Sequence, residues 1–217
     1  ARITAYTGDA TELAVPAELD GHPVQEIGDF AFSSCYSLTS VSIPDSLTLI
    51  GENPFGNCLS LLEIMVSPDH PVLAQIDGVL YEKASKTLLA YPAGKEDDTF
   101  SVPEGIVAIG DSAFRGCEFL TTVTLPESLT SIGLYAFHAC PDSFTLIVPR
   151  DSYARQYAIE NSLSYTYPDA NDWLYNRWLQ SAQGFKPQRF KDRGGTSLHR
   201  KRQRFSCHLH ALFFQQK

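Results

Sequence analysis

Four copies of one nine-residue motif constrain this chain more than any other feature of its sequence. Each copy reads Ile-Gly, two free positions, Ala or Pro, Phe, two more free positions and Cys, and the copies begin at Ile27, Ile50, Ile109 and Ile132. The first two copies are 23 residues apart, and so are the last two. A fixed period in the twenties is typical of a solenoid, whose units bury their apolar side chains against one another. The chain is therefore predicted to offer an extended surface before it offers an active site.

The residues between the motifs predict short strands. Ahead of Pro44, Pro103 and Pro126 the chain has a β-type stretch, and proline ends a strand because it has no N–H to donate. The motif glycine then turns the chain, and the phenylalanine is expected to point inward. We predict a β-rich α/β repeat solenoid of about five rungs over residues 1–168.

Two segments depart from the 23-residue period. Residues 64–99 are 13 residues too long, and within them IDGVLYE and KTLLAYP flank the polar KASK. This pattern predicts a β-hairpin at about 75–92 that projects from the stack. Residues 150–168 are predicted to form a short helix and a terminal strand, because a solenoid needs a cap over its open end.

The repeat resembles the BspA-like leucine-rich repeats. Their unit runs Ile-Gly-x-x-Ala-Phe-x-x-Cys-x-x-Leu-x-x-Val-x-Ile-Pro, and residues 27–44 match it at every fixed position. Pro54 and Ser143 depart from it locally. The resemblance covers roughly residues 3–168 and implies a short right-handed leucine-rich-repeat stack. It also implies a secreted or surface protein of a bacterium that adheres to host proteins or other cells, and it supplies no catalytic or binding residue.

Charge divides the chain into an acidic body and a basic tail. Residues 1–185 hold eight basic and 24 acidic residues, a net charge of −16, whereas residues 186–217 hold nine basic residues and one acid. The acidic body disfavours nucleic acid and anionic membranes as partners. The chain has no run of about 18 apolar residues, so no transmembrane segment is predicted. The first residues lack an apolar signal core, so we expect a secretion signal to be absent or already removed.

The four motif cysteines, Cys35, Cys58, Cys117 and Cys140, are predicted to form one column inside the stack. The favoured interpretation is core packing, because cysteine is among the most buried residue types. Neighbouring strands are about 4.8 Å apart, so disulfides Cys35–Cys58 and Cys117–Cys140 stay open as an alternative. A zinc site is disfavoured, because the column has no CxxC pair and no regularly spaced histidine.

No residue pattern predicts catalysis. His138 lies two residues before Cys140 but occupies a free position of the motif, so we expect it to face solvent. His22 and His70 are isolated loop residues. There is no phosphate-binding glycine loop and no nucleophile elbow. We therefore expect no enzymatic activity, no cofactor and no metal.

Strand alternation predicts a flat exposed face that a partner would contact. One outward column comprises Ser40, Glu63, Thr99, Thr122 and Thr145, and the next comprises Ser42, Met65, Ser101, Thr124 and Ile147. The open alternative is a solvated face chosen for strand propensity alone. Tyr81, near the hairpin turn, is a further candidate contact, because loops on a rigid scaffold often carry recognition.

After about residue 168 the repeat stops, and residues 169–217 are predicted to be a largely disordered tail. DANDWLYNRWLQ could form a short amphipathic helix, HRKRQR a basic patch and CHLH a metal-ligand set. A cloning remnant or a shifted reading frame would equally explain the change of charge.

The residue patterns predict a non-enzymatic repeat module, and the resemblance implies that it serves recognition or adhesion at the cell surface or outside the cell. Its partner would be a protein or glycan on a host or neighbouring cell. Two alternatives stay open: a structural spacer in a larger surface protein, and a fragment of an enzyme whose catalytic part lies elsewhere.

Overall fold

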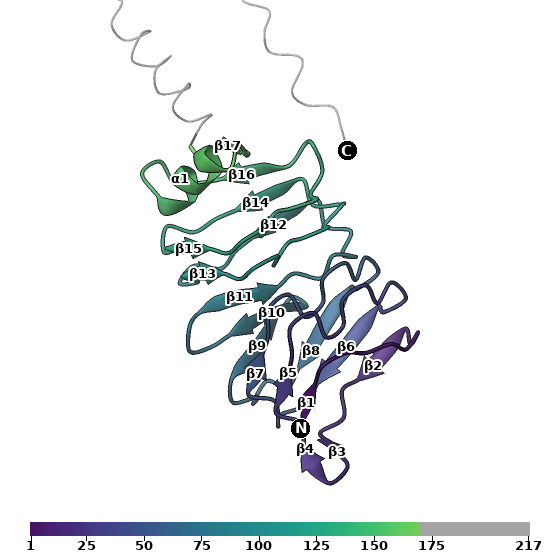
Figure 1. Ribbon diagram of the computed structural model, residues 1–217. Helices are drawn as coiled ribbons and strands as arrows, with labels where there is room; N and C mark the ends of the chain where they lie inside the picture. The colour runs from purple at the N-terminus through teal and green to yellow at the C-terminus, as the bar shows by residue number, and fades with distance from the viewer. Residues whose placement is uncertain (170–217) are drawn as a thin grey trace, which may run out of the picture. The chain divides into compact units, whose positions relative to one another are not determined.

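The computed structural model describes residues 1–169, which lie in one compact unit. The chain winds in successive coils that stack from β1 to β17 (Figure 1). Within residues 1–169 the structure consists of short strands and turns with one α-helix. The predicted β-rich repeat solenoid is therefore confirmed.

Parallel strands in two separate sheets, three strands in each, carry the isoleucine of the motif or its counterpart, and we call them together the isoleucine row. It contains six strands, one from each coil, so the number of coils is close to the predicted number of about five. They are β1 (Arg2–Ile3), β5 (Glu26–Ile27), β7 (Leu49–Ile50), β11 (Thr87–Ala90), β13 (Ala108–Ile109) and β15 (Ser131–Ile132).

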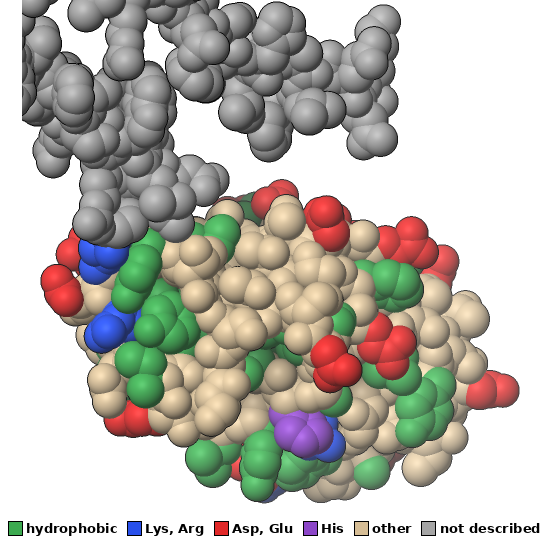
Figure 2. All heavy atoms as spheres, turned by 90° about the horizontal axis from the view of Figure 1, so that it is seen from above, with side chains coloured by type: hydrophobic (Ala, Val, Ile, Leu, Met, Phe, Trp, Pro, Cys, Tyr) green, Lys and Arg blue, Asp and Glu red, His purple; other side chains and the backbone are tan. Residues whose placement is uncertain are grey.

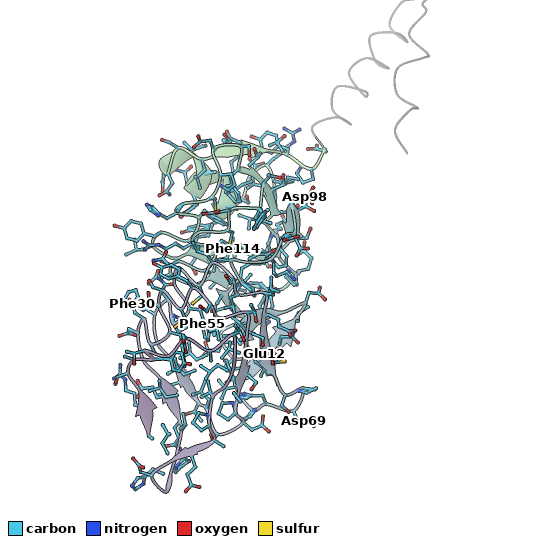
Figure 3. The ribbon with its side chains drawn as sticks, turned by 90° about the vertical axis from the view of Figure 1, so that its right-hand side faces the viewer. Glu12, Phe30, Phe55, Asp69, Asp98 and Phe114 are labelled. Carbon is cyan, nitrogen blue, oxygen red and sulfur yellow. The ribbon has the colours of Figure 1, made fainter. Side chains whose placement is uncertain are left out.

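A second row holds the strands that come after each motif loop or its counterpart. We call the outward side of this row the strand face. Its members are β2 (Glu12–Ala14), β6 (Ser40–Ile43), β8 (Glu63–Val66), β12 (Thr99–Ser101), β14 (Thr122–Thr124), β16 (Thr145–Ile147) and β17 (Ser164–Thr166). Figure 3 labels Glu12 and Asp98 on this side and Phe30 on the opposite side, with Phe55 and Phe114 between them. The inward phenylalanines thus separate the strand face from the motif loops.

Two of the six coils lack the Ile-Gly motif and were missed in the sequence. Ile3 pairs in register with Ile27, and Leu88 pairs with Ile109. In both coils an Ala-Tyr step replaces Ala-Phe, and the tyrosine follows its aliphatic residue by three positions instead of five. Tyr6 lies 5.8 Å from the Phe32 ring, and Tyr91 stacks 5.3 Å from the Phe114 ring. Tyr91 therefore fills the core position of the motif phenylalanine, whereas half-buried Tyr6 packs at the edge of the core.

The inserted hairpin does not project, and this part of the prediction is wrong. Its strands β10 (Val79–Glu82) and β11 pair antiparallel, β9 (Leu73–Ile76) adds outside β10, and β11 continues into the isoleucine row through β13. Val79, Leu80 and Tyr81 are all buried. Three consecutive buried apolar residues are typical of a strand covered on both faces. The hairpin is therefore a buried part of the stack.

The hydrophobic core has two parts, and the hairpin separates them. Residues of the first three coils form one cluster, which Leu80 and Ala90 join from the hairpin. Residues of the last three coils form the other, which Val79, Tyr81 and Leu88 join. Each half thus contains one shortened coil followed by two full coils.

The C-terminal end of the described residues carries the predicted helix and strand. Helix α1 (Tyr153–Glu160) begins at Ser152, whose hydroxyl accepts a hydrogen bond from the Arg155 N–H at 3.2 Å. Such a cap satisfies one of the free N–H groups of the first turn. Strand β17 then pairs with β16 and extends the strand face. At the other end, β3 (Glu18–Leu19) and β4 (His22–Pro23) form a small separate hairpin.

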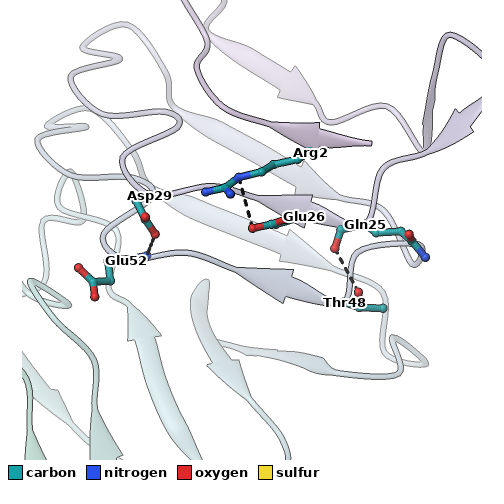
Figure 4. Close-up of polar contacts among 6 residues, drawn as sticks. All are labelled: Arg2, Gln25, Glu26, Asp29, Thr48 and Glu52. Carbon is teal, nitrogen blue, oxygen red and sulfur yellow. Dashed lines mark hydrogen bonds and ion pairs between the residues drawn. The ribbon is translucent and has the colours of Figure 1, made fainter.

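Polar contacts tie each coil to the next. Figure 4 shows three of them near the N-terminus: the Arg2–Glu26 ion pair, the bond from the Glu52 N–H to Asp29, and the bond from the Thr48 hydroxyl to the Gln25 carbonyl. The Asp29 contact, 2.8 Å long, recurs between Leu134 N and Asp111 Oδ1 at 2.6 Å. An aspartate directly after the motif glycine therefore holds the following coil.

The same close approach explains the motif glycine. A Cβ on Gly133 would lie 2.5 Å from the backbone N of Asp111 and 2.7 Å from the carbonyl carbon of Gly110. Gly110 follows a shortened coil, and its nearest neighbour would be the Leu88 carbonyl oxygen at 3.3 Å. The requirement for glycine is therefore strict only where a full coil precedes.

We predict that Gly133→Ala lowers the free energy of unfolding by about 1–3 kcal/mol, because the new methyl group overlaps backbone that cannot move alone. Gly110→Ala is the matched control and should change it by less than about 1 kcal/mol. Urea unfolding followed by far-UV circular dichroism measures both. Equal losses in the two variants would contradict the steric explanation.

Candidate binding surfaces

The strand face of the second half matches the predicted register. Outward residues align in two columns across four parallel strands, Thr99–Thr122–Thr145–Ser164 and Ser101–Thr124–Ile147–Thr166. Thr99 and Ser101 are exposed, whereas Thr122, Thr124, Thr145 and Ile147 are half-buried. Ser164 and Thr166 extend the columns and were missed, because the cap carries no motif.

The predicted columns are not continuous along the whole stack. Ser40 and Glu63 align with Glu12, and Ser42 and Met65 align with Ala14, in a separate sheet of β2, β6 and β8. The structure does not bring Glu63 next to Thr99, because the turn between β9 and β10 packs beside β8: the Gly78 carbonyl accepts a hydrogen bond from Ile64 N at 3.1 Å. The strand face is therefore two patches.

Tyr81 is not available to a partner, which corrects the prediction for this residue. Only 3% of it is exposed, and it packs in the core of the second half. Burial raises the pKa of its hydroxyl well above the ordinary tyrosine value, and the nearby Asp77 raises it further. That hydroxyl has no hydrogen-bond partner among residues 1–169. Tyr81 is therefore a core residue, whereas the sequence pattern predicted that its ring faces solvent.

A second candidate surface lies on the motif loops, residues 28–38, 51–61, 110–120 and 133–143, where large apolar side chains occupy the free positions of the motif. The exposed ones are Phe30, Tyr36, Leu59, Phe119, Leu134 and Tyr135. Leu134 is 73% exposed and Tyr135 65%, and Tyr135 meets His138 edge to face at 5.7 Å. We call these six residues the motif-loop set. Sequence reasoning passed over them because it treated the free positions as solvated.

Two members of the motif-loop set have an unusual backbone. Phe30 and Tyr135 occupy the same position of the motif and have φ of 56°. Bulky residues rarely adopt this left-handed conformation, which asparagine tolerates better, and Asn53 occupies the position in another coil. Strain of this kind persists only where the surrounding structure holds it, and it is frequent at functional sites.

The surface of the described residues is also acidic. Seen from above in Figure 2, acidic side chains stand out at several places around the rim, whereas basic ones are few and local. Hydrophobic side chains gather in separate groups between them. Such a surface favours partners with exposed basic or neutral groups.

The motif cysteines pack inside the stack, as predicted for core residues. Cys35, Cys58 and Cys117 are buried, Cys140 is half-buried, and all four are free thiols. The thiol of Cys58 donates to the Phe32 carbonyl at 3.0 Å, and that of Cys140 to the Phe114 carbonyl at 3.3 Å. Burial raises the pKa of Cys58 to about 12 and that of Cys140 to about 11. The thiolate, the reactive form, is therefore scarce at neutral pH.

The histidines differ from one another in their surroundings. His138 is exposed, as predicted, and so is His22, whereas His70 is fully buried. Among residues 1–169, no three His, Cys, Asp or Glu side chains are grouped to hold a metal ion. In the same range no helix is long and apolar enough to cross a membrane. The amphipathic segment, the basic patch and CHLH of the predicted tail lie outside the described residues.

The repeat itself identifies the family. The BspA type leucine rich repeat region matches residues 12–83 and 94–166 in six copies, which is more than half of the chain. The chain belongs to the BspA-type leucine-rich repeat family. Its stacked coils, buried cysteine column and Ile-Gly turns are the parts of this BspA-type chain that the family pattern specifies, and both candidate surfaces lie outside that pattern.

Solved bacterial proteins share the fold. The pneumococcal vaccine antigen PcpA is 26% identical over 58% of this chain and 34% of its own, with a TM-score of 0.51. A leucine-rich repeat protein of Eubacterium ventriosum is 19% identical over 65% of this chain and 48% of its own, with a TM-score of 0.54. The BspA-type chain thus spans about a third and about half of these two proteins. No curated protein matches its sequence significantly.

Proposed function

We propose that this BspA-type chain is a non-enzymatic recognition module of a secreted or surface-exposed bacterial protein, and that it adheres to a protein or glycan of a host or neighbouring cell. The observation that carries the proposal is the motif-loop set. Six large apolar side chains stand in solvent on a rigid scaffold, at positions where the repeat would accept small polar residues. Tyrosine is enriched among the residues that dominate binding energy, and phenylalanine is enriched at protein interfaces.

The likeness to a pneumococcal vaccine antigen supports the surface location. The strand face is the second proposed contact region. Its hydroxyl-bearing columns offer flat area and hydrogen bonds, but few of the large side chains that supply affinity. We therefore place most of the binding energy on the motif loops.

Binding of residues 1–169 to arrays of host matrix proteins and glycans tests the proposal. Two double variants, each on an exposed or half-buried surface, identify the contact region: Phe119→Ala with Tyr135→Ala on the motif loops, and Thr122→Lys with Thr124→Lys on the strand face. We expect at least one matrix ligand to bind and the motif-loop variant to weaken it by about tenfold or more.

Flat responses across both arrays would count against adhesion and favour a structural spacer. Loss of binding only in the strand-face variant would retain the proposed function but move its contact region.

A further inference from the structure

The N-terminal coil is too short to cover its neighbour. Thr11 follows Ile3 by eight residues, whereas Thr39, which donates to the Thr11 carbonyl at 2.8 Å, follows Ile27 by twelve. The corner of the second coil, residues 33–38, consequently lacks a matching corner beside it. The result is an open hollow of about 250 Å³ between residues 6–10 and 33–38. A hollow beside the other shortened coil, lined by residues from 53–56, 89–93 and 112–115, measures about 10 Å³.

Hydrogen bonds anchor both walls of this hollow to the stack. On one side, the Tyr6 hydroxyl accepts a hydrogen bond from Ala10 N, and Tyr6 N donates to the Ala31 carbonyl at 2.7 Å. A Cβ on Gly8 would lie 2.5 Å from the Tyr6 ring, so a larger residue there would have to displace the Tyr6 side chain. On the other side, Ser34 N donates to the Gly56 carbonyl at 2.7 Å, which anchors the corner to the third coil. A ligand would therefore meet a preformed site and lose little affinity to ordering.

The lining of the hollow is mixed, and four of its polar side chains have no hydrogen-bond partner among the described residues. Asp9, Ser33, Ser34 and Ser37 line the hollow, and their side chains make no hydrogen bond within residues 1–169. Elsewhere in the stack, carboxylates accept hydrogen bonds from the protein itself: Asp29 and Asp111 each accept one from a backbone N–H of the following coil. The hollow thus gathers a carboxylate and three hydroxyls that are free to bind a ligand with several hydroxyl groups.

Tyr36 adds an apolar surface at the same place. It lines the hollow and is 60% exposed, and its N–H donates to the Ser34 carbonyl at 2.9 Å, which keeps the loop compact. An aromatic face beside hydroxyl and carboxylate groups matches a sugar ring, which has one face of C–H groups and an edge of hydroxyls. An apolar ligand would instead leave the polar walls desolvated.

We propose that this hollow is a subsite for one neutral pyranose ring. Its volume is just below the about 300–1,000 Å³ of pockets for drug-sized ligands, which suits a single ring. Anionic sugars are disfavoured, because the lining contains Asp9 and no lysine or arginine. This inference rests on the proposed recognition function and assigns its ligand class. For one ring in an open polar site, we expect a dissociation constant on the order of 1 mM.

Saturation-transfer difference NMR with methyl glycosides of glucose, galactose, mannose and N-acetylglucosamine tests the subsite on the full chain. We expect at least one glycoside to bind, and Tyr36→Ala to weaken it about tenfold or more through loss of the stacking face. Tyr36→Phe, which keeps that face, should retain most of the binding. Tyr153→Ala is the matched control, an exposed tyrosine on helix α1 outside both candidate surfaces, and should bind as the parent does.

Failure of all four glycosides to bind would overturn the subsite, and so would equal binding by the parent and Tyr36→Ala. Either result leaves the matrix-protein arrays as a separate measurement. A chain that binds a matrix protein but none of the glycosides would therefore refute this inference and retain the proposed function.

Discussion

Phe114→Ala is expected to lower the free energy of unfolding by about 3–5 kcal/mol, the largest loss among the substitutions considered. Phe114 is fully buried, and its ring stacks 5.3 Å from Tyr91 and 5.2 Å from Phe137. It joins the shortened fourth coil to the full coils after it, so its removal leaves a cavity between coils. The free energy of unfolding of a single domain is about 5–15 kcal/mol, so the variant would keep only a small part of its stability.

Urea unfolding followed by far-UV circular dichroism measures this loss. Phe119→Ala is the control, because it removes the same side chain from the same coil at a position that is 49% exposed. It should change stability by less than about 0.5 kcal/mol. Comparable losses in Phe114→Ala and Phe119→Ala would show that the aromatic stack does not hold the coils together.

His70→Ala is expected to cost about 2–4 kcal/mol, because it removes a buried junction of hydrogen bonds. The Nδ1 atom of His70 accepts from Val72 N at 3.2 Å and from Leu73 N at 3.0 Å, and Nε2 lies 3.2 Å from the Pro44 carbonyl oxygen. These bonds fix the segment that leads into the inserted hairpin. Because hairpin residues contribute to both halves of the core, loosening that segment weakens both.

The same unfolding measurement tests His70, with His22→Ala as an exposed control that should be nearly neutral. His70→Asn should recover part of the loss, because its side-chain oxygen can accept from the two backbone N–H groups in place of Nδ1. A His70→Ala variant as stable as the parent would show that water replaces the ring without cost.

The sequence alone predicted the coils that carry the full motif, because isoleucine, phenylalanine and cysteine recur at one spacing. It did not reveal the coils of Tyr6 and Tyr91, since tyrosine in place of phenylalanine and a loop shortened by two residues erase the periodic match. It located the inserted hairpin but placed Tyr81 in solvent. Alternation within one segment does not tell whether a neighbouring half of the molecule covers the second face.

The candidate surfaces were harder to predict for a related reason. The register of Thr99, Thr122 and Thr145 followed from the period. Exposed residues such as Tyr36 and Leu134 occupy positions that the repeat leaves free, so no pattern distinguishes them from solvated residues. The hollow beside Tyr36 depends on the length of the preceding coil, whose paired residues lie 24 positions earlier in the sequence. Such a feature becomes visible only when the coils are stacked.

The division of the core into two halves has a consequence for how such proteins change length during evolution. Each half is one shortened coil and two full coils with its own buried cluster, and the wall between them is a single hairpin. Leu80 and Ala90 of the hairpin pack in the first cluster, and Val79 and Tyr81 pack in the second, so both clusters stay complete only if the hairpin is kept. A change in chain length that removed the hairpin would therefore expose both clusters at once.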